Sequence, residues 1–191
     1  MSFKEFLFEN NNSIYLELEQ LYKNGDKNSE KKAEKLVAEA AKKSGYTIGP
    51  VWHGDPLEQH NIYHPEKTTE GGIFFTTSHA VAKYFSGPRN EPRSFYLNIT
   101  NIKEIEPDEV MEPEDQGWVH SEKKMREAIL KAKKQKFNGV IIKDIDEEAG
   151  ISDQYIAFYS EQIKLSNPFT YDNNIILLDK RFDKTNPDIR Y

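Results

Sequence analysis

The 191-residue chain contains no cysteine, which excludes disulfides, thiolate metal sites and cysteine nucleophiles. No apolar run approaches the roughly 20 residues that a membrane-spanning helix requires. Residues 1–7 include an acidic side chain and too short an apolar run for a secretory signal. A phosphate-binding glycine loop is lacking too, because Gly71–Gly72 precedes an apolar segment and is not joined by the lysine and serine of that motif. These absences predict a soluble, cytoplasmic protein.

The composition is that of a globular protein with a strongly polar surface. Hydrophobic residues make up 37% of the chain, aromatic residues 12% and charged residues 30%. The length suits one domain, with at most a small appendage, and is sufficient for a sizeable core. The net charge of −6 argues against broad affinity for nucleic acids, although a local basic patch can still hold a phosphate.

Two helices are expected before the main body. Residues 14–21 carry apolar side chains at helical spacing, with Ser13 as the N-cap and Asn24–Gly25 as the stop. A second helix opens at residues 28–29 and closes at Gly45. The sequence therefore predicts an N-terminal helical arm over residues 1–46 packed on a body over residues 47–180, followed by a polar, loosely held tail over residues 181–191.

From residue 47 onward, short apolar or alternating segments replace the helical spacing. Strands are expected at 50–53, 73–75, 94–99, 102–105, 140–142, 154–158 and 175–178, helices at 79–85 and 121–136, and loops at 107–117 and 144–151. Many short strands with few helices between them predict an α+β domain with a mainly antiparallel sheet.

Three segments of this body carry the side chains that suggest a site. His53 and Gly54 are adjacent at the end of a short strand, where a histidine can bond a sugar hydroxyl and a glycine lets a planar ligand approach the backbone. A histidine at the end of a strand more often has no role beyond a hydrogen bond to a neighbouring group. The pair therefore indicates a site only if other segments supply further ligand-binding side chains. Those segments are residues 71–76, with Tyr84 on the following helix, and Asp153–Phe158.

In this order and at this spacing, the three segments resemble the diphtheria-toxin and poly(ADP-ribose) polymerase branch of the ADP-ribosyltransferases. The helix over residues 37–46, the strand over 139–143 and the Tyr155–Lys164 ending are similar to the ADP-ribosyltransferase domains of large polyvalent proteins in phages and conjugative elements. The resemblance covers residues 14–165. It implies an ADP-ribosyltransferase-like split β-sandwich of mainly antiparallel short strands with an N-terminal helical hairpin.

The resemblance also implies roles for individual residues toward NAD. His53 would bond the adenosine ribose, Gly54 would clamp the nicotinamide carboxamide through its backbone, and Gln154 would hold the nicotinamide ribose and stabilise developing positive charge. His53 and Gln154 are thus the predicted catalytic pair. The other predicted NAD-binding residues are Tyr84 and Phe74 on either side of the nicotinamide ring, Thr76, and Arg89 near the pyrophosphate.

The chain departs from the family pattern at two of these positions. Phe74 replaces a tyrosine and cannot donate a hydrogen bond, and it is equally well explained as a core aromatic. Gln154 replaces a glutamate and brings no negative charge, while the adjacent Asp153 is expected to point to the opposite face of its strand. Ser152 stands where the arginine-modifying branch carries an acidic residue, which argues against arginine as the acceptor.

The sequence thus favours an NAD-dependent mono-ADP-ribosyltransferase of a phage or mobile element, acting on a host protein or nucleic acid in the host cytoplasm or carried in the virion. NAD hydrolysis, a non-catalytic relative that binds NAD, ADP-ribose or a partner, and a structural accessory protein stay open as alternatives. No metal is expected, because His60 and His64 fall in a loop without a third ligand.

Overall fold

A computed structural model describes residues 3–55, 60–114, 117–147, 149–169 and 176–191, with the backbone alone for residues 3–10, 114 and 117–120. The helices are α1 (Phe3–Lys23), α2 (Lys27–Lys43), α3 (His79–Ser86) and α4 (Glu122–Lys134), with three short 3₁₀ turns at Pro65–Lys67, Pro107–Glu109 and Ser160–Gln162. The strands are β1 (Ile48–His53), β2 (Ile73–Thr76), β3 (Arg93–Leu97), β4 (Ile102–Ile105), β5 (Met111–Glu114), β6 (Gly117–His120), β7 (Gly139–Glu147), β8 (Gly150–Ala157) and β9 (Ile163–Leu165).

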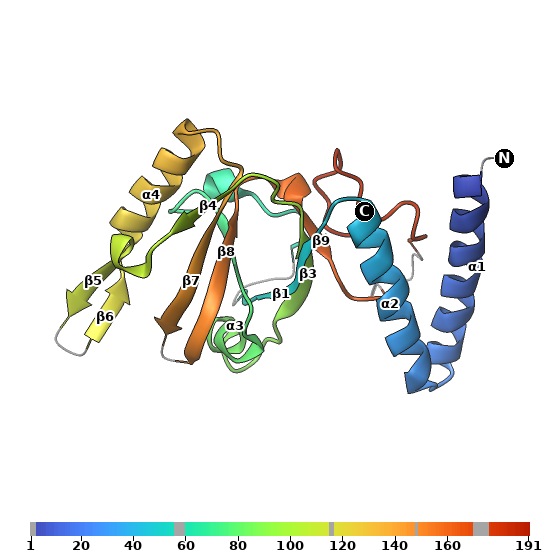
Figure 1. Ribbon diagram of the computed structural model, residues 1–191. Coiled ribbons are helices and arrows are strands. Elements are labelled where there is room, and N and C mark those ends of the chain that lie inside the picture. Colours follow the sequence, from blue (N-terminus) through green and yellow to red (C-terminus); the bar gives the residue numbers. More distant parts are fainter. Residues whose placement is uncertain (1–2, 56–59, 115–116, 148, 170–175) are drawn as a thin grey trace.

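Seven strands form one mixed sheet in the order β4-β7-β8-β2-β1-β3-β9, and β5 pairs with β6 in a separate hairpin. Within the large sheet β4 and β7 are parallel, and the other neighbours are antiparallel. Among the described strands, β1 and β2 meet at a single residue pair, Trp52 opposite Thr76. The sheet is therefore weakly joined there, with β7 and β8 on one side and β1, β3 and β9 on the other (Figure 1). The predicted α+β class with a mostly antiparallel sheet and an N-terminal helix pair is confirmed.

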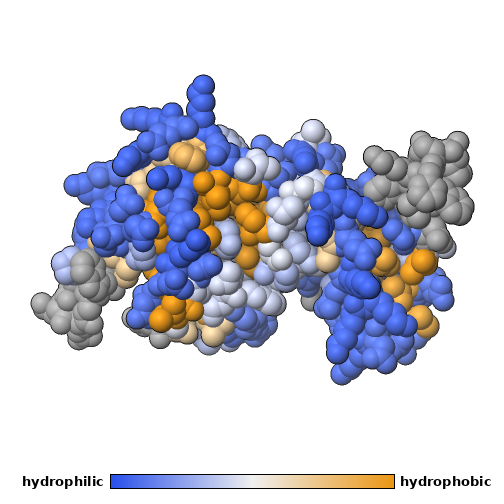
Figure 2. Space-filling view, viewed as in Figure 1, coloured by the Kyte–Doolittle hydropathy of each residue, from blue (hydrophilic) through white to orange (hydrophobic). Residues whose placement is uncertain are grey.

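The core is divided between the two parts of the sheet. Under α4, the buried side chains are Met125, Ile129 and Ala132 from the helix and Val140, Ile142, Ile145 and Ile156 from β7 and β8. A second cluster around Val51, Phe75 and Phe95 supports β1, β2 and β3. Most of the visible surface is hydrophilic, and hydrophobic residues show over β7 and β8 and between α1 and α2 (Figure 2).

The N-terminal arm differs from the expectation at its start. Ser13 was expected as an N-cap, but it lies inside α1, which runs without a break from Phe3 to Lys23. Tyr15 and Leu18 are buried against α2, and this packing overrides the poor helix propensity of the preceding asparagines. Helix α2 is capped by the Asp26 side chain and ends, as expected, before Gly45 in the left-handed region (φ 86°).

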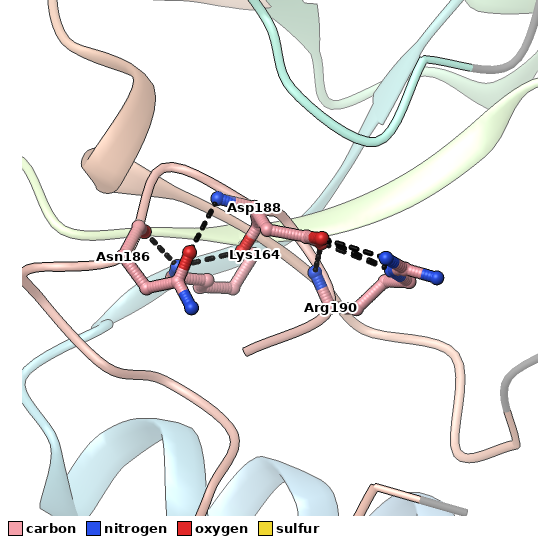
Figure 3. A network of polar contacts seen from close by, with 4 residues as sticks. All are labelled: Lys164, Asn186, Asp188 and Arg190. Carbon is pink, nitrogen blue, oxygen red and sulfur yellow. Dashed lines mark hydrogen bonds and ion pairs between the residues drawn. The ribbon is translucent and has the colours of Figure 1, made fainter. Parts of the chain in front are cut away.

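The C-terminal segment is held firmly on the body, in contrast to the loose tail expected from the sequence. The buried Lys164 ammonium on β9 donates to the carbonyl oxygens of Asn186 (2.5 Å) and Asp188 (2.9 Å), and the Asp188 carboxylate pairs with Arg190 (Figure 3). Burial lowers the pKa of Lys164 to about 8. Arg181 is also buried and donates to three backbone carbonyls, those of Leu165, Asn167 and Pro168.

Three sequence expectations for local structure are corrected. The predicted loop over 107–117 contains a 3₁₀ turn and strand β5, and the predicted loop over 144–151 contains the end of β7 and the start of β8. Of the predicted strand 175–178, the described residues 176–178 are not in a strand. Ile176 and Leu178 are buried, so their apolar character reflects packing and not strand pairing. In the described part of the chain, no helix is long and apolar enough to cross a membrane.

Candidate active site

A cavity of about 340 Å³ opens where β1 and β2 part. It is lined by Trp52, His53, Gly54, Glu70, Phe74, Phe75, Thr76, Val81, Ala82, Phe85, Glu122, Met125, Glu147 and Gln154. Five of the residues predicted from the sequence are therefore brought together: His53, Gly54, Phe74, Thr76 and Gln154. They come from the ends of β1 and β2 and from the middle of β8.

The strand register aligns three of the lining residues in one row. Trp52 lies opposite Thr76, and Thr76 lies opposite Gln154. Side chains directly opposite each other on neighbouring strands share a face of the sheet. The Thr76 hydroxyl donates to Ser152 (2.7 Å) and accepts from the backbone N–H of Ser78 (3.1 Å), so it also holds the start of α3 against the sheet.

The hydrogen bond of His53 fixes the state of its ring. Nδ1 lies 2.6 Å from the carbonyl oxygen of Phe74, and because a carbonyl only accepts, Nδ1 carries the proton. Nε2 of the neutral ring is then an acceptor. The ring packs against Tyr63, Phe75 and Phe95. Burial in this apolar surrounding lowers the pKa of His53, which the bond to Phe74 partly opposes.

Acidification is expected to destabilise the fold through His53. Because its folded-state pKa lies below the ordinary value near 6.5, the unfolded chain binds more protons between the two values, and stability falls as the pH drops through that window. Melting temperatures at pH about 7.5 and about 5 should show a larger loss for wild type than for His53→Asn. The other four histidines are the same in both proteins. Equal decreases in melting temperature for the two proteins would show that His53 is not the source of the acid sensitivity.

Gly54 is required by the packing of α3. A Cβ at this position would stand 2.2 Å from the carbonyl oxygen of Ala82 and 2.8 Å from the backbone nitrogen of Ser86. Both atoms belong to the helix backbone, which has no flexible side chain that could give way. The sequence explained this glycine by the approach of a ligand, and the structure adds that it lets α3 close one wall of the cavity.

Gln154 is the most buried polar residue of the cavity lining, at 5% exposure. Its Nε2 donates to Oε1 of Glu147 at 2.5 Å, which sets the orientation of the carboxamide because a carboxylate accepts and does not donate. Its Oε1 has no hydrogen-bond partner among the residues that the structure describes. Asp153, as expected, points elsewhere: its carboxylate accepts from the backbone N–H of Asp144 (3.1 Å).

Three glutamates in the cavity lining, Glu70, Glu122 and Glu147, were not predicted from the sequence. Glu147 falls in the segment expected to be a loop. Glu122 is the first residue of α4, and acidic side chains are common there because the positive end of the helix dipole stabilises them. Burial raises the pKa of Glu147 above its ordinary value near 4.5, and the hydrogen bond from Gln154 acts in the opposite direction.

Two predicted NAD-binding residues are not brought to the cavity. Tyr84 is 53% exposed and lies outside the lining, because the arc of α3 that faces the cavity carries Val81, Ala82 and Phe85. Phe85, one residue further along, is thus the aromatic ring that α3 contributes. Arg89 is exposed beyond the end of α3 and is likewise not among the lining residues.

No group of three or more His, Asp or Glu side chains suited to a metal ion is found among the described residues. His60 lies 3.8 Å from the Asp55 carboxylate, and His64 lies 3.0 Å from that of Glu66. The two histidines therefore have separate acidic neighbours.

The chain matches the family model described as ADP-ribosyltransferase in polyvalent proteins over residues 45–168. This span contains β1 to β9 and every cavity-lining residue, while α1 and α2 precede it. The match confirms the resemblance drawn from the sequence, which extended further back, to residue 14. Comparison with the curated proteins and with the solved structures gives no match. Since the matched span is more than half of its length, the chain belongs to the family of ADP-ribosyltransferases in polyvalent proteins.

Proposed function

We propose that the protein is a mono-ADP-ribosyltransferase that cleaves NAD and transfers ADP-ribose to a host macromolecule. The observation that carries this proposal is that His53, Phe74 and Gln154, from three different strands, line one cavity. These strands hold the corresponding histidine, aromatic and acidic or amide positions in the resemblance described above. Membership of the family supports NAD as the substrate.

In the proposed reaction, the bond between C1 of the nicotinamide ribose and the pyridine nitrogen breaks, and its electron pair leaves with nicotinamide. The ribose then carries positive charge, and a lone pair of the acceptor forms the new bond to C1 while the acceptor's proton passes to water. A preorganised site accelerates such a step by placing dipoles and negative charge where the positive charge develops.

The charge and shape of the cavity fit the nicotinamide end of NAD. The oxidised nicotinamide ring is cationic, and three carboxylates line the cavity, which favours a cation there. Phe74 and Phe85 offer ring faces for stacking and for cation–π contact. With the nicotinamide ring stacked there, Nε2 of His53 accepts a hydrogen bond from a hydroxyl of the adenosine ribose. Oε1 of Gln154 accepts one from a hydroxyl of the nicotinamide ribose.

Binding without turnover is the second candidate function, and Phe74 favours it. A tyrosine at this position could bond a ligand hydroxyl, whereas Phe74, which is packed against the cluster under α4, offers a ligand only apolar and stacking contacts. Ser152, two residues before Gln154, is buried and bonded to Thr76. It provides no acidic group toward an arginine acceptor, which argues against arginine as the modified residue.

The test is incubation of the purified protein with NAD labelled in its ADP-ribose part, with and without host-cell lysate. Release of nicotinamide with label on a protein or nucleic acid supports the transferase. Release with free ADP-ribose alone indicates a glycohydrolase. A rise in melting temperature with NAD but without release supports the binding function. If NAD neither reacts nor raises the melting temperature, the proposal is wrong.

A further inference from the structure

We propose that Glu147 supplies the negative charge that the transferase site needs and that Gln154, in the family's glutamate position, cannot provide. The inference rests on the proposed function and assigns the catalytic carboxylate to a different strand from the one that the family pattern indicates. It is carried by the path of β7, by the contact between Glu147 and Gln154, and by the cavity that both side chains line.

A β-bulge turns Glu147 toward Gln154. In the β7–β8 pair, Ile142 lies opposite Gln154 and Ile145 lies opposite Ser152, so two residues of β7 intervene where β8 has one. Asp144, in the bulge, has a left-handed backbone (φ 50°), a conformation that aspartate tolerates better than most residues. Regular alternation from Ile142 would place Glu147 on the opposite face. With the extra residue, Ile142 and Ile145 lie on the same face of the sheet, and both are buried in the cluster under α4. Alternation resumes after Ile145, so Glu147 lies on this face too.

The side chain of Asp153 stabilises this bulge. Its carboxylate accepts from the backbone N–H of Asp144 at 3.1 Å, and its own N–H donates to the Thr77 hydroxyl at 3.1 Å. Bulges occur preferentially next to active sites, where they re-aim a side chain. Here the re-aimed side chain is the carboxylate that contacts Gln154.

Glu147 and Gln154 form a pair with complementary tasks. The Glu147 carboxylate accepts from Nε2 of Gln154 at 2.5 Å, and this bond directs Oε1 of Gln154, which has no partner among the described residues. Oε1 is thus the acceptor for a ribose hydroxyl, and the Glu147 carboxylate behind it carries a negative charge in its ionised form. When the bond to nicotinamide breaks and its electron pair leaves with the ring, this charge lies beside the ribose that becomes positive. Its attraction is strengthened by the low-dielectric surroundings.

The test compares nicotinamide release from NAD by full-length variants. Glu147→Gln keeps the shape and can still accept from Gln154, so the KM for NAD should stay within about threefold while kcat falls about 100-fold or more. Asp146→Asn is the matched control, since Asp146 is the exposed neighbour on the same strand, and it should leave kcat unchanged. The rise in melting temperature with NAD shows whether each variant is folded and binds.

Exchanging the two groups distinguishes charge from structure. The double variant Glu147→Gln/Gln154→Glu places the carboxylate in the family position beside a carboxamide. Its kcat should be about tenfold or more above that of Glu147→Gln. Gln154→Glu alone brings two carboxylates into contact, which then share one proton, so it adds no net negative charge to the site and should release nicotinamide no faster than wild type.

Each alternative outcome bears on a different claim. Wild-type protein that releases no nicotinamide contradicts the proposed function itself. Active wild type with an equally active Glu147→Gln variant overturns the assignment of Glu147 alone. A rate of nicotinamide release that rises about tenfold or more in Gln154→Glu also overturns the assignment of Glu147. Such a rise would mean that the wild-type site lacks a catalytic carboxylate.

Discussion

The His53→Asn variant is expected to bind NAD about tenfold or more weakly than wild type while it melts within a few degrees of it. In the structure, Nδ1 of His53 donates to the Phe74 carbonyl at 2.6 Å, and the amide nitrogen of asparagine can donate in its place. Asparagine is too short to replace Nε2, which is the acceptor that we assign to the adenosine ribose. Titration calorimetry with NAD measures the loss.

Two further variants separate affinity from stability. His53→Ala removes the donor to Phe74 as well, so it should lose the affinity and about 2 kcal/mol or more of stability, because a buried carbonyl is left without its partner. His64→Asn is the matched control: His64 is exposed, bonded to Glu66, and absent from the cavity lining. Unchanged NAD affinity in His53→Asn would remove His53 from the binding site.

Substitution of Gly54 by alanine is expected to destabilise the protein by about 3 kcal/mol, which corresponds to about 6–12 °C in melting temperature for a chain of this size. The added Cβ would stand 2.2 Å from the Ala82 carbonyl oxygen, so α3 would have to move away from β1. That movement would displace Val81, Ala82 and Phe85 from the cavity wall, and NAD binding should fall with stability.

Gly87→Ala is the control for backbone conformation. Gly87 ends the same helix with φ 73° and ψ 178°, a backbone region that is essentially restricted to glycine, and a Cβ there would meet nothing within 4 Å. Alanine at this position should therefore cost about 1–3 kcal/mol from backbone strain alone and leave the cavity wall in place. Titration calorimetry with NAD separates the two variants, because only Gly54→Ala should lose affinity. If Gly54→Ala binds NAD as tightly as Gly87→Ala, the close approach of α3 does not explain Gly54.

Much of the sheet could be predicted because apolar segments and turn glycines mark its strands. The Gly71–Gly72 break followed by Ile73–Phe75, and the Asn138–Gly139 turn followed by Val140–Ile142, both correspond to observed strands. The same reasoning placed His53 and Gln154 on strands that the structure brings to one cavity.

The parts that escaped prediction depend on contacts that no local pattern records. The charged end of β7, residues 143–147, reads as a loop, and the bulge at Asp144 arises only in pairing with β8. Simple alternation therefore could not assign Glu147 to the Gln154 face. Tyr84 and Phe85 are adjacent aromatics, and only the orientation of α3 against β1 decides that Phe85 faces the cavity.

The most direct test of the central claim is a crystal structure of the protein with a non-hydrolysable NAD analogue. We expect nicotinamide between Gly54 and Phe74, its ribose hydroxyl on Oε1 of Gln154, and the adenosine ribose on Nε2 of His53. The Glu147 carboxylate should lie beside the nicotinamide ribose. An analogue bound outside this cavity, or bound in it with adenine at Gln154, would contradict the account.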